Sequence, residues 1–83
     1  MRKELILQGF ESLIENLSIG LRYEKGDFKG GLCKISDKRL LILNNKLTIE
    51  QKISIMAKEL KNMNLEKIYI RPALREIIEE KSN

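Results

Sequence analysis

The chain has 83 residues, of which 42% are apolar and 34% charged, and its formal net charge is +4. This length fits a single domain over residues 1–83, and this balance of residues is typical of a globular chain and excludes a disordered one. The sequence contains no His, which excludes the commonest general base, the Ser-His and Cys-His nucleophile pairs, and most zinc and iron sites.

Residues 2–18 are predicted to form a helix, because apolar residues recur there at helical spacing. The stripe comprises Ile6, Phe10, Leu13, Ile14 and Leu17. Leu5 and Leu7 widen the apolar surface beyond this stripe, which suits either a core or a partner protein.

Three strands are predicted next. Residues 19–24 alternate between apolar and polar side chains, which is typical of a strand with one polar face. After a turn that includes Gly26, a second strand is expected over 32–35 and a hairpin tip at Ser36-Asp37. Residues 40–43 are all apolar, which favours a central strand covered on both faces.

The second helix has the clearest start signal in the chain. Thr48 is followed three residues later by Gln51, which predicts a capping box, and apolar residues then recur through Met63. Residues 67–70 form a short apolar run that predicts a fourth strand. A last helix is expected to begin at Pro72, because proline is favoured at the first helical position.

These elements predict an α+β fold of order α-β-β-β-α-β-α. We expect a small twisted sheet of three to four strands, mainly antiparallel and covered mostly on one face by helices. Sequential strands favour a meander, and the helix before the fourth strand permits a crossover.

The segment 31–63 resembles the hairpin-plus-active-helix core of ImmA/IrrE-type zinc peptidases. In that family a strand ends in an "IxxN"-like segment, here the run that closes on Asn44, and the helix carries A-H-E-x-x-H. Ala57 and Glu59 match the helical motif, but Lys58 and Asn62 replace both zinc ligands. The resemblance therefore implies a catalytically dead relative that binds no metal. The alternative is that these residues form an ordinary solvated helix face.

Two further features of the chain bear on chemistry. The loop 26–31 contains three glycines and a Lys, but it lacks the Gly-Lys-Ser/Thr ending of a phosphate-binding loop. Glycines that let the strand connection bend explain it, although its amides could also cup an anion. Cys33 is the only cysteine, and we expect it to be a buried or half-buried structural residue rather than a reactive thiol.

Positive charge concentrates in the middle of the chain, where residues 22–71 hold 12 basic and 6 acidic side chains. The candidate anion or nucleic-acid contacts are Arg22, Lys29, Lys34, Lys38 and Arg39. If they shared one surface, the sheet region would offer a basic face for nucleic acid, with Tyr23 or Phe28 available for stacking. Dispersed lysines that serve solubility are the alternative.

Surplus aliphatic surface on the two terminal helices suggests a protein partner or a second copy of the chain. The candidate partner surface is Leu5, Leu7, Ile77 and Ile78. The leading hypothesis is a non-catalytic protein-interaction or adaptor module, a self-associating homodimer for instance, with nucleic-acid binding as the alternative.

We expect no cofactor, no metal, no membrane span and no enzymatic activity. The basic N-terminal residues are not followed by the uninterrupted apolar run of a signal peptide, because Glu4, Gln8 and Glu11 intervene. A single cysteine without a disulfide partner fits a reducing compartment, so the expected location is the cytoplasm.

Overall fold

The computed structural model describes residues 2–80, which form an α+β fold with three helices and one three-stranded sheet. The element order is α-β-β-β-α-α. The elements are α1 (Lys3–Asn16), β1 (Ile19–Glu24), β2 (Gly30–Ile35), β3 (Lys38–Asn44), α2 (Ile49–Lys61) and α3 (Pro72–Glu80). The fold class predicted from the sequence is confirmed.

The start of α2 is the capping box that the sequence predicts. The Gln51 amide donates to Thr48 Oγ1 at 3.2 Å, and the Thr48 amide donates to Gln51 Oε1 at 2.9 Å. These two bonds satisfy amides that have no partner within the helix. The helix α3 begins at Pro72, also as predicted, because this position needs no amide donor.

The strands lie in the order β1-β3-β2, so β3 is central. β3 runs parallel to β1 and antiparallel to β2, and the sheet is therefore mixed. The expected meander is wrong, because residues 25–29 carry the chain past the end of β3 before β2 begins. The β2–β3 hairpin closes through the pair Ile35 and Lys38, with Ser36 at a φ of 57° in the turn.

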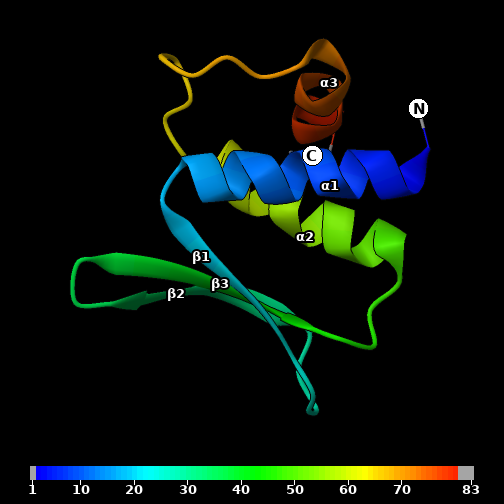
Figure 1. Cartoon of the computed structure of the whole chain (residues 1–83), viewed down its shortest axis with the longest axis vertical. Helices are drawn as coiled ribbons and strands as arrows, with labels where there is room; N and C mark the ends of the chain where they lie inside the picture. The colour runs from blue at the N-terminus through cyan, green and yellow to red at the C-terminus, as the bar shows by residue number, and fades with distance from the viewer. Residues whose placement is uncertain (1, 81–83) are drawn as a thin grey trace.

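All three helices lie on one side of the sheet (Figure 1). α1 and α2 cross that face, and α3 lies beyond them, away from the strands. The hydrophobic core fills the space between these layers. Its fully buried side chains include Phe10, Ile14, Leu41, Leu43, Met56 and Leu60. No helix of residues 2–80 lies on the opposite face of the sheet, in agreement with the expected covering mostly on one face.

The predicted fourth strand at 67–70 is wrong, since the segment between α2 and α3 is an irregular connection. Ile70 is buried and Ile68 packs against the core, so the apolar run does contribute to packing. This segment lies on the helix side of the molecule (Figure 1). The helices therefore separate it from the strands, and its backbone has no sheet edge to pair with.

Tyr23 at the end of β1 connects the two helices that cover the sheet. Its hydroxyl donates a hydrogen bond to the Glu11 carboxylate in α1, and the ammonium of Lys52 in α2 lies 4.8 Å from the centre of its ring. Burial, followed by the bond to Glu11, raises the pKa of Tyr23 well above its usual value. The contact thus favours the neutral phenol in the folded chain.

Within residues 2–80, no helix has the length and apolar character needed to cross a membrane.

Candidate functional site

The side chains of the sheet divide into two sets, because successive residues of a strand point to opposite faces and paired residues share a face. Leu41 and Leu43 of β3 point to the helices, so their alternate neighbours Leu40 and Ile42 point away. We call this uncovered side the open face. Its residues are Gly20, Arg22, Glu24, Gly31, Cys33, Ile35, Lys38, Leu40, Ile42 and Asn44.

The middle of the open face is apolar. Leu40 and Ile42 stand half-buried on the central strand, with Cys33 and Ile35 of β2 beside them. Ile35 is 63% exposed, which makes it one of the most exposed aliphatic side chains in residues 2–80. A sheet face of this composition is normally covered by another layer, because exposed apolar surface costs free energy in water.

Charged residues lie around this apolar centre. Arg22 of β1 forms an ion pair with Glu24 at 3.0 Å, and both side chains are largely solvated. Lys38 marks the opposite end of the sheet, beside the hairpin turn. An apolar centre with a polar rim is the usual anatomy of a protein interface.

The crossing loop 25–29 bounds one end of the open face. Asn44 Nδ2 donates to the carbonyl oxygens of Gly26 and Phe28, each at 2.6 Å, and its Oδ1 accepts from the Lys46 amide. Asn44 is buried and fully bonded, so it fixes the loop against the end of β3. The Phe28 ring is thereby held beside the open face at 40% exposure.

Two shallow hollows lie at the two ends of the open face. The first lies beside Phe28, and its walls include Glu24, Gly31, Cys33 and Ile42. The second lies at the hairpin end, and its walls include Gly20, Ile35, Lys38 and Leu40. Each end of the face thus combines one protruding apolar side chain with a depression.

The partner surface predicted from the sequence does not form a patch. Ile78 belongs to the core, because α3 buries it against α1 and α2. Leu7 and Ile77 are half-buried and pack against the same core. Leu5 alone of the four is well exposed, at 53%. Most of the aliphatic side chains on the two terminal helices are therefore covered where the three helices pack together.

The predicted basic residues do not share one surface either. Arg22 and Lys38 lie on the open face, whereas Lys34 and Arg39 form a register pair on the other side of the sheet. Arg39 is half-buried there and its Nη2 lies 3.5 Å from the Leu17 carbonyl oxygen at the end of α1. Lys29 lies in the crossing loop, where it lines the hollow beside Phe28. The alternation of the strands divides these charges between two faces.

Cys33 is exposed on the open face, which corrects the expectation of a buried or half-buried thiol. The physical reason is that β2 is an edge strand and the three helices of the described segment lie on the other side of the sheet. The loop 26–31 is held through two of its carbonyl oxygens, which accept from Asn44. This arrangement assigns the loop a structural role in the strand connection.

The helix positions that resemble the zinc-peptidase motif point in different directions. Ala57 is fully buried, Glu59 is half-buried, and both Lys58 and Asn62 are exposed. Within residues 2–80, no three His, Cys, Asp or Glu side chains come together as metal ligands.

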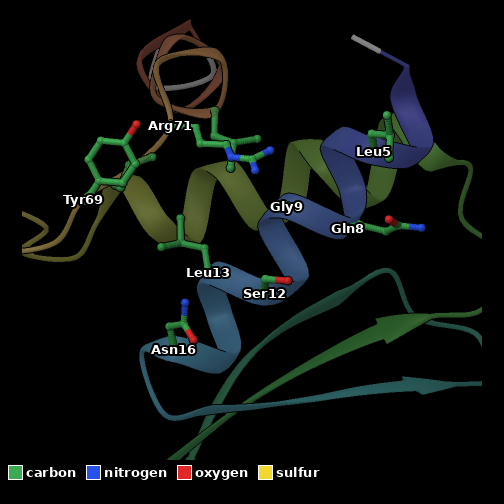
Figure 2. Close-up of a pocket in the computed structure, with 10 residues that line it drawn as sticks. Leu5, Gln8, Gly9, Ser12, Leu13, Asn16, Tyr69 and Arg71 are labelled. Atoms are coloured by element: carbon green, nitrogen blue, oxygen red, sulfur yellow. The ribbon is translucent and has the colours of Figure 1, made fainter.

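A groove of about 390 Å³ lies on the other side of the molecule, between α1 and the segment 69–74 (Figure 2). One wall is formed by α1 and includes Gln8, Ser12 and Asn16, which follow one another along the helix. Tyr69, which is 82% exposed, and Arg71 stand on the other wall. The groove combines these polar groups with the apolar side chains of Leu5, Leu13, Ile70 and Leu74, and it carries a single charge, that of Arg71.

Comparison of the chain with protein-family models, with curated proteins and with solved structures finds no match. The geometry of the chain itself is therefore what indicates a function. Sequence reasoning missed the open face because it placed the surplus apolar surface on the two terminal helices. The signal was the unbroken apolar run at 40–43, because a strand that is apolar on both faces favours cover on both, and the helices of residues 2–80 lie on one side only.

Proposed function

We propose that the chain is a non-catalytic protein-interaction module that self-associates by packing its open face against the open face of a second copy. The observation that carries this proposal is the apolar centre of that face, where Ile35 is 63% exposed and no helix of the described residues 2–80 lies above it. Two sheets that pack face to face bury such side chains between them. Self-association is also a common source of stability for domains of this size.

A second copy suits the open face on electrostatic grounds. The strands of the face carry two cations, Arg22 and Lys38, and one anion, Glu24, while Lys29 and Asp37 line the hollows at its ends, so its formal charge is only +1. Two identical faces can therefore approach without strong repulsion. A two-fold dimer uses the same patch on both subunits, and this patch offers cations and an anion to its own copy.

The same geometry weakens the case for nucleic acid. A phosphate-binding face gathers its cations on one side, but the sheet separates Lys34 and Arg39 from Arg22 and Lys38. Arg22 is in addition already paired with Glu24. The arrangement favours a protein occupant of the open face.

The proposed setting is the cytoplasm. Cys33 lies exposed within the apolar centre of the open face, and a reducing compartment keeps such a thiol available for packing. Oxidation of Cys33 would add polar atoms to a surface that packs through apolar contacts.

The test compares two substitutions of exposed aliphatic residues. Ile35→Lys places a charge in the proposed interface, and Leu5→Lys makes the same kind of change on α1, outside it. Sedimentation velocity should show a dimer for the wild type and for Leu5→Lys, and a monomer for Ile35→Lys. Circular dichroism should report the same fold for all three, because both side chains are exposed. If the Ile35→Lys variant is still a dimer, the two copies associate through another surface, such as the free edge of β2.

A further inference from the structure

The outer edge of β2 has no neighbouring strand within residues 2–80, because β2 is the last strand of the order β1-β3-β2. In an antiparallel pair, residues that bond across to the partner strand alternate with residues that point their amide and carbonyl groups away. The Asn44 amide donates to the Lys29 carbonyl oxygen at 3.0 Å, so position 29 bonds toward β3. Every second residue of β2 after it bonds the same way, and Leu32 and Lys34 therefore direct their backbone groups to the free edge.

Leu32 is incompletely covered at this edge. It lies on the helix side of the sheet opposite Leu41, yet Leu32 is 37% exposed whereas Leu41 is buried. The helices therefore cover the central strand and leave the outer part of β2 open to water. A further strand beside β2 would place a side chain next to Leu32 and cover it.

Two cations lie beyond Leu32 on the same side of the sheet. Lys34 and Arg39 are register partners, and like charges directly opposite each other on a sheet are destabilising. No carboxylate among residues 2–80 forms an ion pair with either of them, and Asp37, the acid nearest in sequence, is exposed in the hairpin turn. The pair thus lacks an anion that would offset its repulsion.

We propose that the free edge of β2 binds an extended acidic segment of another protein, which adds to the sheet as a fourth strand. The backbone of the segment pairs with Leu32 and Lys34, one of its aliphatic side chains covers Leu32, and a carboxylate two residues away pairs with Lys34. This spacing holds for either direction of the added strand, because side chains on one face recur at every second position. The edge is separate from the open face, so the proposal does not depend on self-association.

A second copy of β2 does not have the chemistry of this segment. β2 contains a lysine and no acidic residue, so two copies paired edge to edge would bring no carboxylate of the strand to Lys34. Lysine on an edge strand is also a common device against such pairing. The charge of the edge therefore favours a different, acidic chain.

The test uses a blocked seven-residue peptide, Thr-Val-Thr-Glu-Thr-Val-Thr, in which a Val lies two residues from the Glu on both sides. The required spacing is thus present whichever way the peptide runs. Titration of the wild-type chain, followed by two-dimensional NMR, should shift the signals of β2 with a dissociation constant below about 1 mM. The same peptide with Lys in place of Glu should bind about tenfold more weakly, because it places a cation beside Lys34.

Charge reversal on the protein identifies the contact. Lys34→Glu should weaken binding of the Glu peptide about tenfold and strengthen binding of the Lys peptide, because the two charges are exchanged. The variant should fold, since it replaces the repulsion between Lys34 and Arg39 by an attraction. Lys38→Glu is the matched control, because it reverses an exposed charge of the same hairpin on the open face. It should leave both dissociation constants within about threefold of the wild type.

Amide hydrogen exchange reports whether the two backbones pair. The amides of Leu32 and Lys34 should exchange more slowly when the Glu peptide is bound. The amides of Cys33 and Ile35 already bond to β3, and their exchange should not change.

Slower exchange at Leu32 and Lys34, together with the reversed peptide preference of Lys34→Glu, supports the proposal. It is overturned if no signal shifts at millimolar peptide, if the peptide binds without slowing these amides, or if Lys34→Glu and Lys38→Glu weaken binding equally. Protection of the two amides in the peptide-free chain that is lost on dilution assigns the edge to a second copy and overturns it too. A monomeric wild type overturns the self-association proposed above and leaves this test unaffected.

Discussion

Asn44 at the end of β3 donates a hydrogen bond to the carbonyl oxygen of Phe28 at 2.6 Å, and through it the central strand positions the aromatic ring at the end of the open face. The same amide nitrogen donates to the Gly26 carbonyl oxygen. One buried side chain therefore fixes both the path of the crossing loop and the shape of the candidate interface.

Asn44→Ala should lower the free energy of unfolding by about 2–3 kcal/mol, because it leaves two loop carbonyl oxygens without their donor. Urea denaturation measures this change. The neighbouring Asn45→Ala, which alters an exposed side chain, should stay within about 0.5 kcal/mol of the wild type. Equal stabilities of the two variants would show that the loop does not depend on the amide.

Gly30 and Gly31 are adjacent but should respond differently to alanine. Gly30 has a φ of 139°, and a β-carbon there would lie 2.5 Å from the Ile42 carbonyl oxygen, so Gly30→Ala should cost at least about 2 kcal/mol. Gly31→Ala meets open space and should change the unfolding free energy by less than about 0.5 kcal/mol.

Both alanine variants are best compared by denaturation in the Ile35→Lys background, so that association makes no contribution. A Gly30→Ala variant as stable as Gly31→Ala would contradict the close approach of β2 to β3 at this point.

The raised pKa of Tyr23 predicts a loss of stability at alkaline pH. Above about pH 10 the tyrosine of the unfolded chain ionises while the folded chain still holds its proton, so the unfolded state binds fewer protons and stability falls as pH rises. Tyr23→Phe should remove this part of the pH dependence, as seen in unfolding curves collected between neutral and alkaline pH.

Tyr69→Phe is the matched control for that experiment, because it removes a hydroxyl from an exposed side chain and should behave as the wild type. If the unfolding free energy of Tyr23→Phe falls with pH as steeply as that of the wild type, the bond from Tyr23 to Glu11 does not determine the loss of stability at alkaline pH.

Removal of the cap of α2 should cost about 1 kcal/mol in Thr48→Ala, because the Gln51 amide loses its acceptor. The thermal midpoint should fall accordingly. Ser12→Ala changes a hydroxyl on the exposed face of α1 and should leave that midpoint nearly unchanged. An unaltered midpoint in Thr48→Ala would mean that the helix start is held by packing alone.

Local signals predicted local structure well. The pair Thr48 and Gln51 located the start of α2, and Pro72 located the start of α3, because capping and proline geometry depend on a few neighbouring residues. The run at 67–70 was misassigned, since apolar character signals burial and does not specify which partner backbone is in reach.

Strand order and the open face depend on contacts distant in sequence. Asn44 holds the loop 25–29 in the path that crosses the end of β3 and so excludes a meander. The pattern of apolar and polar residues along the chain does not indicate this contact. Likewise the exposure of Ile35 and the burial of Ile78 follow from where the helices lie. The sequence indicated more apolar surface than the core needs, but it did not indicate which face of the molecule exposes that surface.

The most direct test of self-association is sedimentation equilibrium of the wild-type chain at concentrations up to the order of 100 μM, where even micromolar dimers form. The account predicts twice the 9.7 kDa chain mass, with dissociation on dilution. The ratio of absorbance at 260 and 280 nm should be that of protein alone, a sensitive criterion because the chain has two Tyr and no Trp. A mass of 9.7 kDa at every concentration would contradict self-association. A monomer that carries nucleic acid would instead favour nucleic-acid binding through the basic residues.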